Sequence, residues 1–217
     1  MKKINMVDLQ GQYKKIRSEV NREIKKVLKS ATFINGPIVK EFELNLKDFL
    51  ETKNVIPCAN GTDALQVALM SLGVEKGDEV ITTSHSWIST SETISQTGAT
   101  PIFVDVEEDF FTLDPNLIKD KITSKTKAII PVHLYGQPAN MDSINEIAKK
   151  HGLIVIEDAA QAHAAKYKGK MIGSLGNTTC FSFYPGKNFG AYGEGGAVVT
   201  DDGDIANHIR MLRDHGQ

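Results

Sequence analysis

The chain has 217 residues, of which 41% are hydrophobic and 24% are charged, and its formal net charge is −2. This composition is typical of a soluble globular protein, and the length suits one large domain or two small ones. Because the chain lacks a strong positive field, we expect neither nucleic acid nor an anionic membrane as a partner.

Targeting signals and cysteine usage both favour a cytoplasmic protein. No apolar run approaches membrane-spanning length, and no hydrophobic segment of a signal peptide follows the charged N-terminus. Cys58 and Cys180 lie in apolar, strand-like segments without metal-ligand spacing, so we expect buried free thiols in a reducing compartment.

In chain order, the pattern begins with helices over residues 16–50, interrupted by a break at 32–37. Beyond residue 54, short apolar runs alternate with helical periodicity. The apolar runs predict strands at 55–59, 79–83, 101–106, 128–134, 153–157, 178–183 and 197–200. The stretches between and after them predict helices at 62–72, 88–96, 116–122, 141–151 and 204–213.

Short apolar strands separated by helices predict an α/β protein, with a mostly parallel sheet covered by helices on both faces in three α/β/α layers. Ligands of such sheets bind beyond the carboxyl ends of the strands. Polar residues follow several of the predicted strands, so we expect one site at this edge, made by residues 60–61, 84–87, His133, Asp158 and the loop around Lys187.

Lys187 lies in the segment Ser-Phe-Tyr-Pro-Gly-Lys-Asn-Phe-Gly (182–190), directly after a predicted strand, and Asp158 ends the apolar strand before it. A strand-end aspartate and a loop lysine are what a pyridoxal 5′-phosphate (PLP) enzyme requires. The lysine holds the cofactor as a Schiff base and later acts as general base, while the aspartate pairs with the pyridinium nitrogen. The structural alternatives are an exposed loop lysine and a helix-capping aspartate. A Walker A loop is not supported, because Asn188 stands where serine or threonine is needed.

Two further segments suit the same cofactor. Residues 60–63 open a predicted helix, whose free N–H groups suit a phosphate, and the hydroxyl of Ser182 could reach the same group. An ordinary capped helix is an equally good interpretation of residues 60–63. Trp87 follows a strand end, where its indole could stack on a pyridine ring, although a core tryptophan is the alternative.

Gln161 and His163 follow Asp158 closely enough to line the same cleft. A glutamine can bind the ring hydroxyl of the cofactor, and a histidine can contact substrate or transfer protons. Each could equally be a polar residue satisfied within the fold. A hydrolase triad and a metal site have no support, because the G-x-S-x-G motif and metal-ligand spacing of histidines are missing from the sequence.

Several motifs together resemble one known family over essentially all 217 residues. They are Phe-Ile-Asn-Gly-Pro (33–37), Asn-Gly-Thr-Asp-Ala-Leu (60–65), Pro-Val-His-Leu-Tyr-Gly (131–136), Glu-Asp-Ala-Ala-Gln-Ala (157–162) and the segment 181–196. They resemble the DegT/DnrJ/EryC1/StrS family of PLP-dependent sugar aminotransferases, which have the fold type I (aspartate aminotransferase-like) large domain.

The resemblance implies an enzyme that moves an amino group from an amino acid, usually glutamate, to a nucleotide-linked keto-sugar. It implies a homodimer with shared active sites, and amination at C3 of the sugar rather than C4. Carried over residue by residue, the catalytic residues are Lys187 and Asp158, and the cofactor contacts are Gly61, Thr62, Trp87, Asp158, Gln161, Ser182 and Lys187. His163 and Tyr184 are the expected substrate contacts.

A dehydratase branch of the family has histidine in place of the lysine, so Lys187 favours transamination. Family members continue beyond Gln217 into a C-terminal small domain. We therefore expect a helical segment over residues 1–50 that packs on a PLP-binding large domain over 51–217, with the small domain absent. The alternatives are a truncated PLP-binding chain without full activity, and a PLP-dependent dehydratase on the same fold.

Overall fold

The computed structural model describes residue 4 and residues 6–217. Two helices, α1 (Leu9–Ser30) and α2 (Pro37–Leu50), precede the sheet. Its strands are β1 (Asn54–Cys58), β2 (Glu79–Thr83), β3 (Thr100–Val104), β4 (Thr126–Ile130), β5 (Ile154–Asp158), β8 (Thr178–Ser182) and β9 (Gly196–Thr200). The helices between and after them are α3 (Gly61–Ser71), α4 (Ser89–Gln96), α5 (Pro115–Ile118), α6 (Met141–His151) and α7 (Gly203–Arg213), with short 3₁₀ turns η1 (Lys119–Lys121) and η2 (Leu134–Gly136). A small hairpin, β6 (Lys166–Tyr167) and β7 (Lys170–Met171), precedes β8.

The seven-stranded sheet has the order β1-β9-β8-β5-β4-β2-β3. Neighbouring strands are parallel from β8 to β3, whereas β9 is antiparallel to both of its neighbours, β1 and β8. All strands except β9 therefore point the same way, and their carboxyl ends share one edge. This confirms the predicted mostly parallel sheet.

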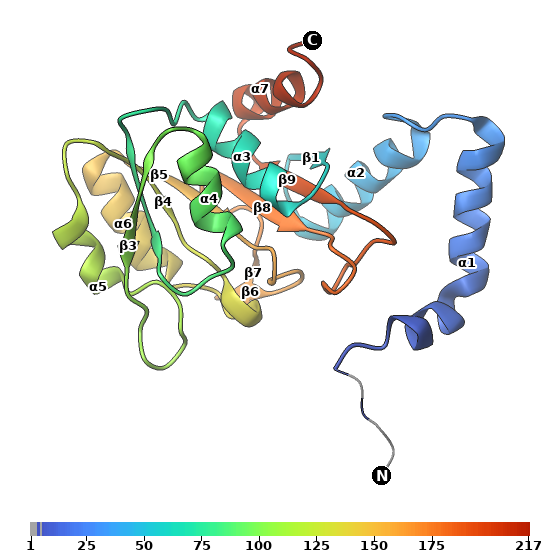
Figure 1. Cartoon of the computed structure of the whole chain (residues 1–217), viewed down its shortest axis with the longest axis horizontal. Helices are drawn as coiled ribbons and strands as arrows, with labels where there is room; N and C mark the ends of the chain where they lie inside the picture. The colour runs from blue at the N-terminus through green and yellow to red at the C-terminus, as the bar shows by residue number, and fades with distance from the viewer. Residues whose placement is uncertain (1–3, 5) are drawn as a thin grey trace.

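Side-chain alternation along the strands divides the core between the two faces. One face packs Ile56, Val80, Cys180 and Val198 against α3, α4 and α7. The other face packs its strand residues against α5 and α6 in one cluster and against α2 in another. The three-layer α/β/α arrangement is thus confirmed, and Figure 1 shows the helices around the sheet.

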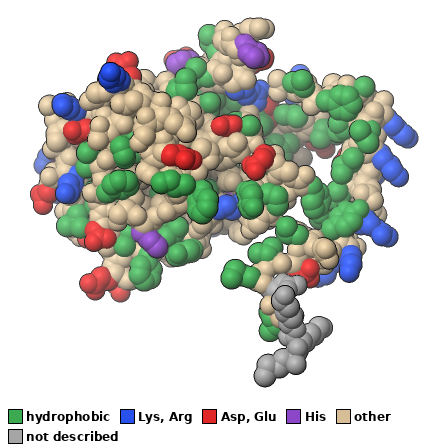
Figure 2. Space-filling view, viewed as in Figure 1, with side chains coloured by type: hydrophobic (Ala, Val, Ile, Leu, Met, Phe, Trp, Pro, Cys, Tyr) green, Lys and Arg blue, Asp and Glu red, His purple; other side chains and the backbone are tan. Residues whose placement is uncertain are grey.

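The N-terminal helices differ in how they pack. Helix α2 buries Leu46 and Leu50, whereas α1 has no buried residue and stands apart from the body of the molecule (Figure 1). Tyr192 lies in the loop before β9. Its ring packs edge-on against the ring of Tyr13, with 5.9 Å between the two ring centroids. Lys and Arg side chains lie on the outer side of α1, and hydrophobic side chains lie on the side that faces the sheet (Figure 2). No helix among the described residues is both long and apolar enough to span a bilayer.

The predicted strands and helices are all present, most within two residues of their expected ends, with three corrections and one omission. The first helix, α1, begins at Leu9 and not at the predicted residue 16. The predicted strand 128–134 is wrong at both ends, because β4 runs from Thr126 to Ile130. It stops before Pro131, which has no N–H to donate to the sheet. The predicted helix 116–122 shortens to α5 and continues as the 3₁₀ turn η1. The β6–β7 hairpin was not predicted; its turn is made by Lys168 and Gly169, whose φ angles of 49° and 86° are those of a tight hairpin turn.

Candidate active site

A cavity of about 580 Å³ opens at the carboxyl edge of the sheet. Its size is that of a small-molecule site. The loops after β1, β2, β5 and β8 line it, together with the residues that follow β4. Eight of the predicted site residues meet there: Gly61, Thr62, Trp87, Asp158, Gln161, Ser182, Tyr184 and Lys187.

Asp158 ends β5 at the floor of this cavity, with 6% of its surface exposed. Its Oδ2 accepts a hydrogen bond from Thr90 Oγ1 at 2.8 Å, and its Oδ1 accepts one from the backbone N–H of Ala160 at 3.2 Å. Burial raises the pKa of Asp158, and the two hydrogen bonds oppose that rise. A buried carboxylate that faces a cavity is a natural partner for a cationic ligand group.

Lys187 is half-buried and reaches the same cavity from the loop after β8. Burial lowers the pKa of Lys187, and the negative charge of Asp158 opposes the change. The loop folds back on itself, since Lys187 N–H donates to Tyr184 O at 2.8 Å and Gly190 N–H to Lys187 O at 2.9 Å. A Cβ on Gly190 would lie 2.3 Å from Pro185 O, so only glycine fits this turn.

The N-terminus of α3 forms one wall of the cavity. Asn60 caps the helix through its Oδ1, which accepts from Asp63 N–H at 2.8 Å. The first N–H groups of a helix have no intrahelical acceptor, and the helix dipole favours an anion beside them. Ser182 lies so close that a Cβ on Gly61 would be 2.6 Å from its Cβ. Thr62 Oγ1 also lies 2.9 Å from the hydroxyl of Ser89.

Gln161 is oriented by an unusual turn. Its Oε1 accepts from the backbone N–H of Tyr135 at 2.7 Å, and Tyr135 has a left-handed φ of 57°. Because a backbone N–H can only donate, the amide oxygen is fixed there and the NH₂ group is left for another acceptor. Trp87 and Tyr184 also line the cavity, with 74% and 56% of their surfaces exposed.

His163 does not line the cavity with the others. It is 5% exposed, and its ring packs against Phe181, Phe183 and Phe189 with centroid distances of 5.3, 5.7 and 5.4 Å. Burial, with a smaller effect from the nearby positive charge of Lys187, lowers the pKa of His163 to about 4. The ring is therefore neutral at physiological pH, behind the wall that carries the lysine loop.

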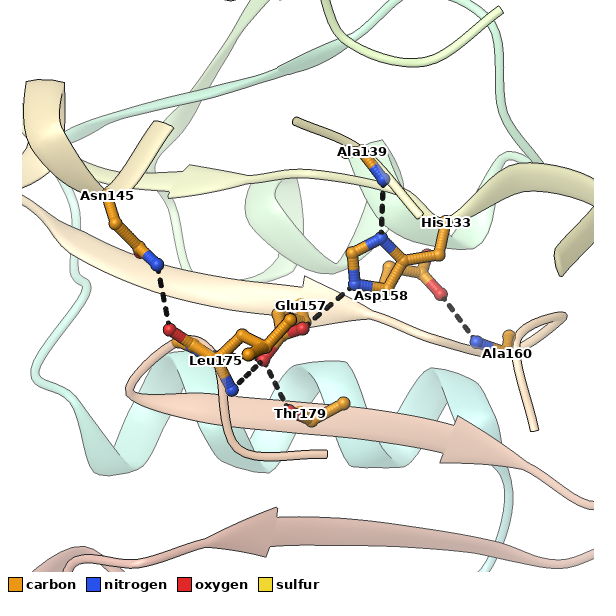
Figure 3. A network of polar contacts seen from close by, with 9 residues as sticks. His133, Ala139, Asn145, Glu157, Asp158, Ala160, Leu175 and Thr179 are labelled. Atoms are coloured by element: carbon orange, nitrogen blue, oxygen red, sulfur yellow. Dashed lines mark hydrogen bonds and ion pairs between the residues drawn. The ribbon is translucent and has the colours of Figure 1, made fainter. Parts of the chain in front are cut away.

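His133, which the sequence predicts among the residues of the site, does not line the cavity but lies in a buried polar network with Glu157. His133 Nε2 lies 2.9 Å from Glu157 Oε2, and both side chains are fully buried (Figure 3). The backbone N–H of Ala139 donates to His133 Nδ1, which assigns the proton of the neutral ring to Nε2. The sequence does not predict the pairing of His133 with Glu157, and its one signal is the acidic Glu157 inside an otherwise apolar strand. Thr90, the partner of Asp158, was likewise not singled out.

Known proteins of one family are similar to this chain over most of its length. Residues 14–217 match the model of the DegT/DnrJ/EryC1/StrS aminotransferase family. A Pseudomonas aeruginosa protein, "UDP-2-acetamido-2-deoxy-3-oxo-D-glucuronate aminotransferase", is 48% identical over 99% of this chain. The chain spans 60% of that relative's length.

Two solved structures share the fold. Streptomyces venezuelae DesV, solved "in complex with ketimine intermediate", superimposes with a TM-score of 0.98 and 46% identity over all of this chain and 58% of its own. Bacillus subtilis NtdA, solved "with bound cofactor pmp", gives a TM-score of 0.91 and 34% identity over 97% of this chain and 48% of its own. Together with the family match, they show that the chain belongs to the DegT/DnrJ/EryC1/StrS aminotransferase family.

Proposed function

We propose that the protein is a PLP-dependent aminotransferase that moves an amino group from glutamate to C3 of a nucleotide-linked keto-sugar. The observation that carries this proposal is the convergence of Lys187, Asp158 and the N-terminus of α3 in one cavity. The family membership supports amino transfer, and the name of the Pseudomonas aeruginosa relative supports a nucleotide-linked 3-oxo sugar.

The residues of the cavity fit PLP at both of its ends. Gly61, Thr62 and Ser182 surround a helix N-terminus that suits the phosphate. Across the cavity, the buried carboxylate of Asp158 suits the protonated ring nitrogen. The NH₂ of Gln161, on the side of the amide away from Tyr135, suits the ring hydroxyl, and Trp87 lines the same space with an exposed indole that ring stacking would cover.

Lys187 has two roles in the proposal: it holds the cofactor covalently, and after displacement by the donor it moves the proton. When bound, PLP supplies an electron sink for the substrate carbon that loses its proton. Burial lowers the pKa of Lys187 towards the range in which a neutral amine can act as base. Tyr184 lines the cavity and is a better candidate for a substrate contact than His163, which lies behind the wall.

We propose further that residues 51–217 are the PLP-binding large domain, with residues 1–50 as a helical segment on it, and that the enzyme is a cytoplasmic homodimer with shared sites. Residues 1–3 and 5 of that segment lie outside the described residues. The dimer is supported by large apolar side chains exposed on α1 and in the break between α1 and α2, among them Leu28 (63%), Phe33 (63%) and Ile34 (85%).

The proposal is tested by following both halves of the reaction with the purified protein and added PLP. Glutamate should yield one equivalent of 2-oxoglutarate per cofactor, and a UDP-linked 3-keto sugar should then yield the 3-amino sugar. Lys187→Ala should yield neither product, and Lys168→Ala, at an exposed hairpin lysine, should yield both. PLP binding without 2-oxoglutarate would indicate a PLP-binding chain without full activity, and a dehydrated sugar would indicate the dehydratase.

A further inference from the structure

Thr90 makes a contact that its position in a helix does not require. It lies in the first turn of α4 with 1% of its surface exposed, and its hydroxyl donates to Asp158 Oδ2 at 2.8 Å, across to the end of β5. Thr93, one turn later and also buried, instead donates to carbonyls of its own helix, those of Ser89 and Thr90. Thr93 shows the usual behaviour of a helical threonine, so the contact of Thr90 with Asp158 is specific.

The hydroxyl of Thr90 has a second partner, Ser86 Oγ, at 2.9 Å. An ionised carboxylate can only accept hydrogen bonds, so Thr90 donates its single hydroxyl hydrogen to Asp158. Ser86 must therefore donate its own hydroxyl hydrogen to Thr90. Ser86 itself lines the cavity. The result is a directed chain of two hydroxyls that runs from the cavity wall to the carboxylate, and hydrogen bonds in such chains strengthen one another.

We propose that Thr90, supported by Ser86, is a positioning residue that keeps the Asp158 carboxylate ionised and aims its free electron pairs at the ring nitrogen of the cofactor. This inference rests on the proposed function for its purpose but not for its geometry. With Thr90 on Oδ2 and the backbone N–H of Ala160 on Oδ1, the carboxylate is held at both oxygens before any ligand binds.

Other titratable groups face Asp158 from the elements around it. His133 follows β4, Lys187 lies in the loop after β8, and the Cys180 thiol lies on β8. The neighbouring Glu157 side chain is engaged elsewhere, by the segment before β8. None of these groups is altered by removing the hydroxyl of Thr90, so a change in Asp158 titration on that removal reports on the hydroxyl chain itself.

The experiment compares Thr90→Val, Thr90→Ser and Thr93→Val with the wild-type protein. The first readout is the carboxyl ¹³C shift of Asp158 during a pH titration without cofactor, with the signal assigned by its loss in Asp158→Asn. Thr90→Val should raise the pKa of Asp158, because a donor to the charged form is lost. Thr90→Ser should restore the wild-type titration, and Thr93→Val should match it.

The second readout is the dissociation constant for PLP, which Thr90→Val should increase about tenfold and Thr90→Ser should bring back. If Thr90→Val does not fold, Ser86→Ala at the cavity wall is measured in its place. This variant should shift the Asp158 titration in the same direction by a smaller amount. An unchanged Asp158 titration in the folded variants, or a Thr90→Ser variant no better than Thr90→Val, would overturn the proposal. A shifted titration in a protein that does not bind PLP would leave the hydroxyl chain in place and count against the proposed function alone.

Discussion

His133 and Glu157 form a fully buried hydrogen-bonded pair, with 2.9 Å between Nε2 and Oε2, directly behind the candidate catalytic residue Asp158. The backbone N–H of His133 also donates to Asp158 O at 3.0 Å. The other oxygen of Glu157 accepts three more hydrogen bonds, from Leu175 N, Gly176 N and Thr179 Oγ1. The pair thus ties the ends of β4 and β5 to β8 and to the segment before it, and so fixes the floor of the cavity.

Glu157→Gln should lower the free energy of unfolding by about 3 kcal/mol, because an amide NH₂ would replace an oxygen that now faces a buried donor. Urea denaturation without cofactor measures the loss. Asp142→Asn is the control, since it removes an ion pair with Lys168 between two exposed side chains and should change stability little. Equal losses of stability in the two variants would show that the buried pair contributes no more to stability than the exposed pair.

Gly61→Ala should weaken PLP binding by at least about tenfold, because the new Cβ would displace Ser182 from the cavity wall that we propose binds the phosphate. The matched control is Gly203→Ala. Gly203 is likewise the first residue of a helix, α7, but a Cβ there would have no atom of the described residues within 4 Å. Fluorescence titration with PLP gives both affinities. Equal affinities in the two variants would place the phosphate elsewhere.

His163→Phe should make stability less sensitive to acid. The pKa of His163 is lowered from 6.5 to about 4 in the folded protein, so the unfolded chain binds a proton first as pH falls. The wild type should therefore lose about 2 kcal/mol of stability between about pH 7 and pH 4.5 that the variant keeps. Urea denaturation at both pH values measures the difference, with His151→Gln at the exposed end of α6 as control. Parallel losses in the wild type and His163→Phe would contradict a buried neutral ring.

Asp158→Asn should stabilise the cofactor-free protein at neutral pH. Burial raises the pKa of Asp158 above its ordinary value of 3.8, so the ionised carboxylate costs stability that increases as pH rises above 3.8 and levels off above the folded-state pKa. The advantage of the variant should shrink as the pH approaches 3.8 from above. Thermal unfolding of the two proteins over that range tests the sign, and a variant less stable than the wild type at neutral pH would refute it.

Much of the fold could be predicted from the sequence, because apolar runs and helical periodicity report directly on burial. The strand β2 and the helix α6 have the predicted bounds, Glu79–Thr83 and Met141–His151. The β6–β7 hairpin could not be predicted, because each of its strands has only two residues and a strand pattern needs more.

The site was predictable where local chemistry is unusual and less so where contacts are distant. A lysine among glycines and an aspartate at a strand end can both be identified from the sequence. Thr90 does not, because it stands in a polar helix and its partner lies 68 residues away. The position of His163 away from the cavity could not be predicted from the sequence either. The segment after β5 is irregular, and no periodicity tells which of its side chains face the cavity.

Borohydride reduction of the PLP-loaded protein, followed by peptide mass spectrometry, tests most directly the proposal that Lys187 holds PLP. We expect one reduced cofactor per chain, attached to the peptide that contains Lys187. The label should vanish in Lys187→Ala and persist in Lys168→Ala. A label on other lysines that survives in Lys187→Ala would show that Lys187 does not hold the cofactor.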